Sequence, residues 1–107
     1  MDEDWPPPAA RARASLWAAE RHLRAGEYAA AGDSLGNAIS CGSPGTVAVG
    51  RGLRQLAAAG YRMQAGDPFR AARLLGRART QLAPFLPCYE EVDLDVLLDL
   101  VTASLES

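Results

Sequence analysis

The side chains of this chain that could do chemistry are few and scattered. It has one histidine, His22, and two cysteines, Cys41 and Cys88, with no CxxC pair and no histidine at a zinc-binding spacing. Catalysis by Cys41 would need a base such as His22 beside it. That arrangement is geometrically possible, but a cysteine in a turn is more often inert. We therefore predict no catalytic residue, no metal site and no cofactor.

The best-ordered polar feature is a row of arginines. Arg70, Arg73 and Arg77 have the spacing i, i+3, i+7, which places them on one face of a helix, and Arg62 could extend the patch. Such a row can be a solvated face opposite acidic residues, or a site for an anion or a partner protein. All eleven basic residues of the chain are arginines, which suits bidentate anion contacts and equally suits a GC-rich genome.

Charge is distributed unevenly along the chain, although the formal net charge is −2. Residues 1–10 carry −3, residues 11–79 carry +7 and residues 80–107 carry −6. We expect Arg70, Arg73 and Arg77 to face acidic residues of the 90–99 segment, in the same chain, across a dimer or on an acidic partner. The low pI of about 5.3 and the lack of aromatic residues for stacking beside the arginines make a nucleic-acid partner unlikely.

An internal repeat indicates how these residues are positioned. Ala25–Tyr28 with Leu35–Ala38 matches Ala65–Pro68 with Leu75–Ala78 at an offset of 40 residues. This period is typical of repeated helical hairpins. Apolar residues recur with helical periodicity and none of the stretches alternates, so we predict an all-α fold without a sheet. The five predicted helices cover residues 9–25, 28–40, 46–65, 68–83 and 93–105, as a bundle of two antiparallel hairpins plus a C-terminal helix.

Turn and capping residues set these boundaries. Gly26 ends the first helix, and Asp67 with Pro68 caps and begins the fourth. Pro84 to Glu91 is a predicted loop, and Asp93 is the predicted cap of the last helix. That helix has a wide apolar face, which is typical of a central core helix or a subunit interface.

Two further groups of residues define candidate sites. Ala29, Gly32 and Gly36 would form a flat strip on the second helix, against which another helix could lie. The same small residues could instead leave room for a ligand between the hairpins. The polar lining of that pocket would be Tyr28, Tyr61, His22 and Asp33.

Residues 1–8 are predicted to be a flexible, acidic and proline-rich leader, and residues 9–107 a single helical domain. The chain shows no secretory signal and no stretch able to span a membrane. We therefore expect a cytoplasmic protein.

The order of these landmarks resembles an uncharacterised prokaryotic all-helical family, domain of unknown function three hundred and nine. The similarity lies in the turn Gly26-Glu27-Tyr28, in Arg51-Gly52, in Gly66 to Ala78 and in Val92-Asp93-Leu94. The family's His-Glu pair falls on Gly32 and Asp33 and its second His on Tyr61. Any metal or acid–base role of those positions would therefore be lost here. A weaker similarity, from Gly26 to Ala38, is to tetratricopeptide hairpins.

Two functional hypotheses remain. The first is a small non-enzymatic helical interaction module that associates with itself as a homodimer, or with a protein partner. The alternative is an enzyme or small-molecule-binding protein that uses the pocket between the hairpins.

Overall fold

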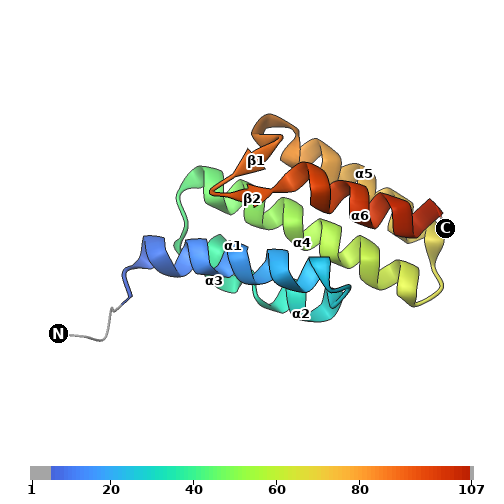
Figure 1. Ribbon diagram of the computed structural model, residues 1–107, viewed down its shortest axis with the longest axis horizontal. Coiled ribbons are helices and arrows are strands. Elements are labelled where there is room, and N and C mark those ends of the chain that lie inside the picture. Colours follow the sequence, from blue (N-terminus) through green and yellow to red (C-terminus); the bar gives the residue numbers. More distant parts are fainter. Residues whose placement is uncertain (1–5, 107) are drawn as a thin grey trace.

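The computed structural model describes residues 6–106, which form a helical bundle (Figure 1). The elements are α1 (Pro8–Arg24), α2 (Tyr28–Asp33), α3 (Gly36–Cys41), α4 (Pro44–Gln64), α5 (Pro68–Leu82), a 3₁₀ turn η2 (Ala83–Phe85), β1 (Cys88–Tyr89), β2 (Val92–Asp93) and α6 (Leu94–Glu106). The first hairpin joins α1 to α2 and α3, the second joins α4 to α5, and α6 closes the bundle. The predicted all-α class is confirmed. Most of the predicted leader, residues 1–5, lies outside the described residues.

The centre of the bundle is α4, which contacts every other α-helix. In Figure 1 it runs between the first hairpin and the pair formed by α5 and α6. The largest fully buried side chains come from α1, α4, α5, α6 and β2 and from Leu35, which lies between α2 and α3: Leu16, Leu35, Val49, Leu53, Leu56, Leu82, Val92, Leu94 and Leu97. The last helix, whose apolar face is wide in the sequence, therefore packs at one side of the core, with Leu100 left 41% exposed.

Glycines on α4 allow its neighbours to approach closely. A Cβ at Gly60 would lie 2.5 Å from the ring of Tyr28, and one at Gly52 would lie 2.5 Å from the side chain of Leu82. A Cβ at Gly32 or Gly36 would meet nothing within 4 Å. The expectation that a helix lies against the Gly32–Gly36 strip is therefore wrong within this chain, and the close packing occurs on α4 instead.

The predicted second helix is divided into α2 and α3 by a side chain from α1. The buried hydroxyl of Ser15 donates a hydrogen bond to the Ser34 carbonyl at 2.5 Å and accepts one from the Ala38 amide at 3.1 Å. In an uninterrupted helix this amide would donate to this carbonyl directly. Ser15 is inserted into that step of the ladder, which is a recognised cause of helix breaks.

A small hairpin precedes α6 and corrects the prediction that no strand forms. β1 and β2 pair antiparallel, with Tyr89 opposite Val92. The turn residues Glu90 and Glu91 both have positive φ, 48° and 67°, as a type I′ turn requires. Asp93 then accepts a hydrogen bond from the Val96 amide at 3.2 Å, so its predicted role as helix cap is confirmed. The cap predicted at Asp67 is confirmed in the same way.

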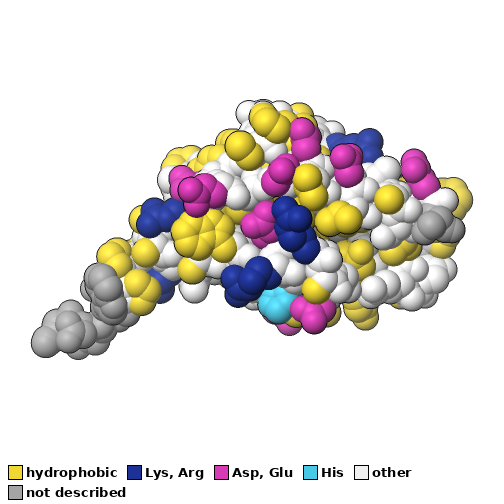
Figure 2. Space-filling view, viewed as in Figure 1, with side chains coloured by type: hydrophobic (Ala, Val, Ile, Leu, Met, Phe, Trp, Pro, Cys, Tyr) yellow, Lys and Arg dark blue, Asp and Glu magenta, His cyan; other side chains and the backbone are white. Residues whose placement is uncertain are grey.

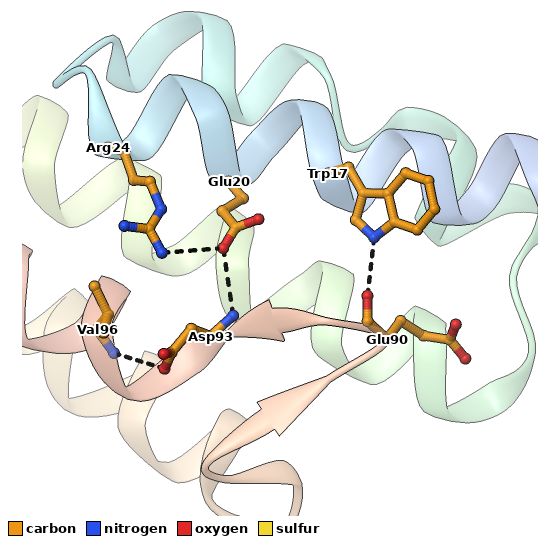
Figure 3. A network of polar contacts seen from close by, with 6 residues as sticks. All are labelled: Trp17, Glu20, Arg24, Glu90, Asp93 and Val96. Carbon is orange, nitrogen blue, oxygen red and sulfur yellow. Dashed lines mark hydrogen bonds and ion pairs between the residues drawn. The ribbon is translucent and has the colours of Figure 1, made fainter.

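This hairpin is fastened to α1 by polar contacts (Figure 3). The indole of Trp17 donates to the Glu90 carbonyl at 2.8 Å, and the Asp93 amide donates to the Glu20 carboxylate at 3.3 Å. Arg24 pairs with the same carboxylate at 3.4 Å. The turn is therefore held in a fixed position at the surface, with its two side chains exposed.

Two glycine-to-alanine substitutions should have opposite effects on stability. Gly60→Ala forces the Tyr28 ring out of place and should lower the free energy of unfolding by about 1–3 kcal/mol. Gly32→Ala enters open space in a helix and should raise it by about 0.5–1 kcal/mol. Urea denaturation followed by circular dichroism measures both. Equal effects of the two substitutions would contradict the packing described for α4.

Candidate functional site

The predicted arginine row is present on α5 and lines an open hollow. We call Arg62, Arg70, Arg73 and Arg77 the arginine face. Together with Leu74 they surround a hollow of about 340 Å³, here named the Leu74 hollow. Arg62 comes from the end of α4, which is antiparallel to α5, so the hairpin brings it beside the row. Arg70, Arg73 and Arg77 are all exposed.

The arginine face is largely without counter-charges. Arg70 pairs with Asp67 in its own helical turn at 3.6 Å. Within residues 6–106, neither Arg73 nor Arg77 forms an ion pair or a hydrogen bond through its side chain. The expectation that the row faces the acidic 90–99 segment of the same chain is therefore wrong. α5 reaches α6 through a different residue, Arg79, which donates to the Thr102 hydroxyl.

The acidic residues lie on other elements. Glu90 and Glu91 are exposed on the hairpin turn, and Asp95 and Asp99 are exposed on α6, one helical turn apart. We call these four residues the acidic face. Acidic side chains gather over α6 and the hairpin in Figure 2. None of the four side chains takes part in an ion pair among the described residues.

A second hollow borders the arginine face, and reasoning from the sequence missed it. It measures about 490 Å³ and is lined by Gln55, Arg73, Gly76, Arg77, Thr80 and Gln81. Gln55 Oε1 is buried and has no hydrogen-bond partner within the part of the chain that the structure describes. The only signal in the sequence was a glutamine in the middle of α4, between Leu53 and Leu56 of its apolar stripe. We call this cavity the Gln55 hollow.

The residues predicted to line a pocket between the hairpins come together only in part. Tyr28, Asp33 and Tyr61 share an open hollow of about 330 Å³ with Gly32, Arg54, Arg62 and alanines of α2 and α4. Tyr28 is buried by its contact with Gly60, whereas Tyr61 is 51% exposed. We call this cavity the Tyr61 hollow.

His22 is absent from that lining. Its Nδ1 lies 2.8 Å from Glu27 Oε1, at the turn that joins α1 to α2. Cys41 lies at the other end of the first hairpin, beside Arg11. His22 and Arg11 are about 16 Å apart along α1, from a rise of 1.5 Å per residue. The structure therefore does not form the Cys41–His22 pair that nucleophilic catalysis would need.

The described residues hold no group of three or more His, Cys, Asp or Glu side chains arranged to bind a metal ion. Across residues 6–106, every helix is too short or too polar to cross a membrane. No protein-family model, curated protein or solved structure matches this chain. The similarity to domain of unknown function three hundred and nine therefore stays a prediction.

Cys41 should be the thiol that reacts at unusually low pH. A hydrogen bond from the Ser40 hydroxyl, at 3.4 Å, and then the Arg11 guanidinium lower the pKa of the Cys41 thiol. Because the thiolate is the nucleophile, alkylation should begin at a lower pH than for a free cysteine. In a Cys88→Ser background, the rate of iodoacetamide labelling measured against pH would show this. Ser40→Ala should move the profile to higher pH, and an unmoved profile would refute the assigned cause.

Proposed function

We propose that this protein is a non-enzymatic helical interaction module that associates with itself, the arginine face of one copy binding the acidic face of another. The observation that carries the proposal is that two arginines of the arginine face and all four residues of the acidic face form no ion pair within residues 6–106. Among the described residues, Arg73 and Arg77 have no acidic partner, and Glu90, Glu91, Asp95 and Asp99 have no basic one. A second copy supplies the missing charge to each.

The chemistry of the arginines fits this use. A guanidinium binds a carboxylate through a planar fork of two hydrogen bonds, and it sheds water more easily than an ammonium group does. Leu74 gives the hollow between the arginines an apolar floor, which adds buried apolar area to the charge contacts. Complementary charge sets the orientation and the rate of association more than the affinity.

The two faces also restrict the symmetry of the assembly. The arginine faces of two copies repel each other. A dimer in which α5 of one copy packs against α5 of the other is therefore disfavoured. A two-fold homodimer must make the arginine-to-acid contact twice. An assembly that makes it once per neighbouring pair becomes a ring or an open chain.

Two charge-reversed variants should each lose association and regain it when mixed. One is Arg73→Glu with Arg77→Glu, and the other replaces all four acidic-face residues by arginine. Each alone keeps one intact face and lacks its complement, so its self-association should weaken by roughly tenfold or more. Mixed in equal amounts, they should form a one-to-one complex that dissociates at high salt. Sedimentation velocity measures both states.

The matched control is Arg21→Glu with Arg51→Glu. It changes the net charge by the same amount, at exposed positions outside these hollows. If the control loses association to the same extent, the loss in the Arg73→Glu, Arg77→Glu variant is due to the change in net charge alone, which would contradict the proposed contact. A wild-type chain that stays monomeric at high concentration and low salt would refute self-association. Salt-sensitive binding of an oligonucleotide, lost in the Arg73→Glu, Arg77→Glu variant, would identify the face as a phosphate-binding surface instead.

The alternative function, binding of a small molecule, is favoured by one observation. Three of the four residues predicted for it, Tyr28, Asp33 and Tyr61, do line one hollow, together with Arg54. A ligand there should raise the melting temperature by mass action. A thermal-shift screen run on the wild type and on Tyr61→Ala tests this. A compound that stabilises the wild type and not the variant would support the alternative, and the absence of any such compound would leave it without support.

A further inference from the structure

We propose that the Tyr61 hollow binds a free amino acid whose side chain ends in a phenol. Its ammonium group pairs with Asp33 and its carboxylate with Arg54. Its ring lies beside Tyr61, and its phenol hydroxyl bonds the hydroxyl of Tyr28. This inference rests on the alternative function given above and is independent of self-association, because none of these four residues belongs to the arginine face or the acidic face.

Two opposite charges border this hollow without meeting. Asp33 and Arg54 both line it, and both are exposed. Within residues 6–106, neither side chain forms an ion pair or a hydrogen bond. A ligand with a positive and a negative group close together pairs with both of them through charge-assisted hydrogen bonds. The ammonium and carboxylate groups of a free amino acid have this arrangement.

An unpaired hydroxyl on a buried ring is a second, independent observation. Tyr28 is only 7% exposed, and its hydroxyl forms no hydrogen bond with any described residue. The one unpartnered side-chain oxygen or nitrogen buried from solvent in residues 6–106 is Gln55 Oε1, so the Tyr28 hydroxyl keeps contact with solvent. Of the three hollows named above, Tyr28 lines this one alone. A phenol hydroxyl of a ligand can both donate to it and accept from it.

The segment formed by α2 and α3 runs antiparallel to α4 across this hollow. A Cβ at Gly60 would lie 2.5 Å from the ring of Tyr28, whereas one at Gly50 would lie 3.1 Å from Ile39. Later residues of the segment therefore face earlier residues of α4. The end of α2 consequently lies toward the middle of α4, and the start of α2 lies toward the last turns of α4.

The hollow therefore has a charged end and an aromatic end. Asp33 ends α2 and Arg54 lies in the middle of α4, so these two share one end. Tyr28, Tyr61 and Arg62 share the other, where the Tyr61 ring is 51% exposed. Both an exposed ring and a guanidinium group attract an aromatic ring. A phenolic amino acid has the same order of groups, with both charges on one carbon and the ring beyond them.

Small residues leave room for the ligand. Besides these side chains, the hollow is lined by Ala29, Gly32, Ala57 and Ala58. A Cβ at Gly32 would meet nothing within 4 Å, so packing within the chain does not require a glycine there. The volume of about 330 Å³ is near the lower end of the range for small-molecule sites, which suits a ligand of this size.

Four probes that differ by single groups test the assignment. L-tyrosine carries all three polar groups, whereas tyramine lacks the carboxylate, hydroxyphenylpropionate lacks the ammonium and L-phenylalanine lacks the hydroxyl. Titrations followed by two-dimensional NMR of isotope-labelled protein measure each affinity. L-tyrosine should shift amide resonances of α2 and α4. Tyramine and hydroxyphenylpropionate should bind roughly tenfold more weakly, and L-phenylalanine about fivefold more weakly.

Three substitutions remove the matching groups of the protein. Arg54→Gln should abolish the preference for L-tyrosine over tyramine, and Asp33→Asn the preference over hydroxyphenylpropionate. Tyr28→Phe, which keeps the ring against Gly60, should abolish the preference over L-phenylalanine. Each variant should keep the other two preferences, because each removes one contact. The matched control is Arg51→Gln, at an exposed position of α4 outside the hollow, which should keep all three.

Gly32→Leu separates loss of the ligand from loss of the fold. Its Cβ enters open space in a helix, and leucine favours a helix more than glycine does, so the melting temperature should not fall. Its side chain occupies the hollow, so L-tyrosine should no longer shift the resonances of α2 and α4.

Three results would overturn the inference. L-tyrosine near its solubility limit shifts no resonance of α2 or α4, its shifts persist in Gly32→Leu, or the four probes bind equally well. A different compound from the thermal-shift screen, whose effect is lost in Tyr61→Ala, would then keep the alternative function and refute this ligand class. Self-association is unaffected by these outcomes, because Arg73→Glu with Arg77→Glu tests it at a separate face.

Discussion

The arrangement of this protein depends on the close approach of its neighbours to α4. Tyr28 lies against Gly60 and fixes α2, and Leu82 lies against Gly52 and fixes the end of α5. Larger residues at these glycines would push both neighbours outward. The surface hollows follow from this packing. The Tyr61 hollow lies where α2 meets α4, and the Gln55 and Leu74 hollows lie where α4 meets α5. The helix that organises the core therefore also lines every candidate site.

Two buried polar groups, one on α1 and one on α4, differ in whether their hydrogen bonds are satisfied. Ser15 both donates and accepts, so its burial is fully compensated and its effect is to divide α2 from α3. The burial of Gln55 Oε1 is not compensated by any hydrogen bond within the described chain. A satisfied polar group in a core specifies structure, whereas a buried acceptor without a partner costs stability.

The distribution of charge on the surface also follows from the packing of the core. The core takes the apolar stripe of each helix, so the charged stripes of α5 and α6 are both directed to the exterior. The two helices contact each other through Arg79 and Thr102 rather than through Arg73 or Asp99. The basic and acidic residues of neighbouring sequence segments therefore lie on different faces of the bundle. Such a surface attracts a partner of complementary charge and repels a like-charged face of its own kind.

The sequence by itself determined the helices, their caps at Asp67 and Asp93 and the pairing of helices into hairpins. These features depend on residues within a few positions of one another, through periodicity, capping and tight turns. It also indicated that Tyr28 and Tyr61 share one region. Only the tertiary structure decided which glycines pack closely, where the second helix breaks and that Gln55 Oε1 has no hydrogen-bond partner among the described residues. Those outcomes depend on side chains far apart in the chain, such as Ser15 against Ser34, whose meeting no local pattern records.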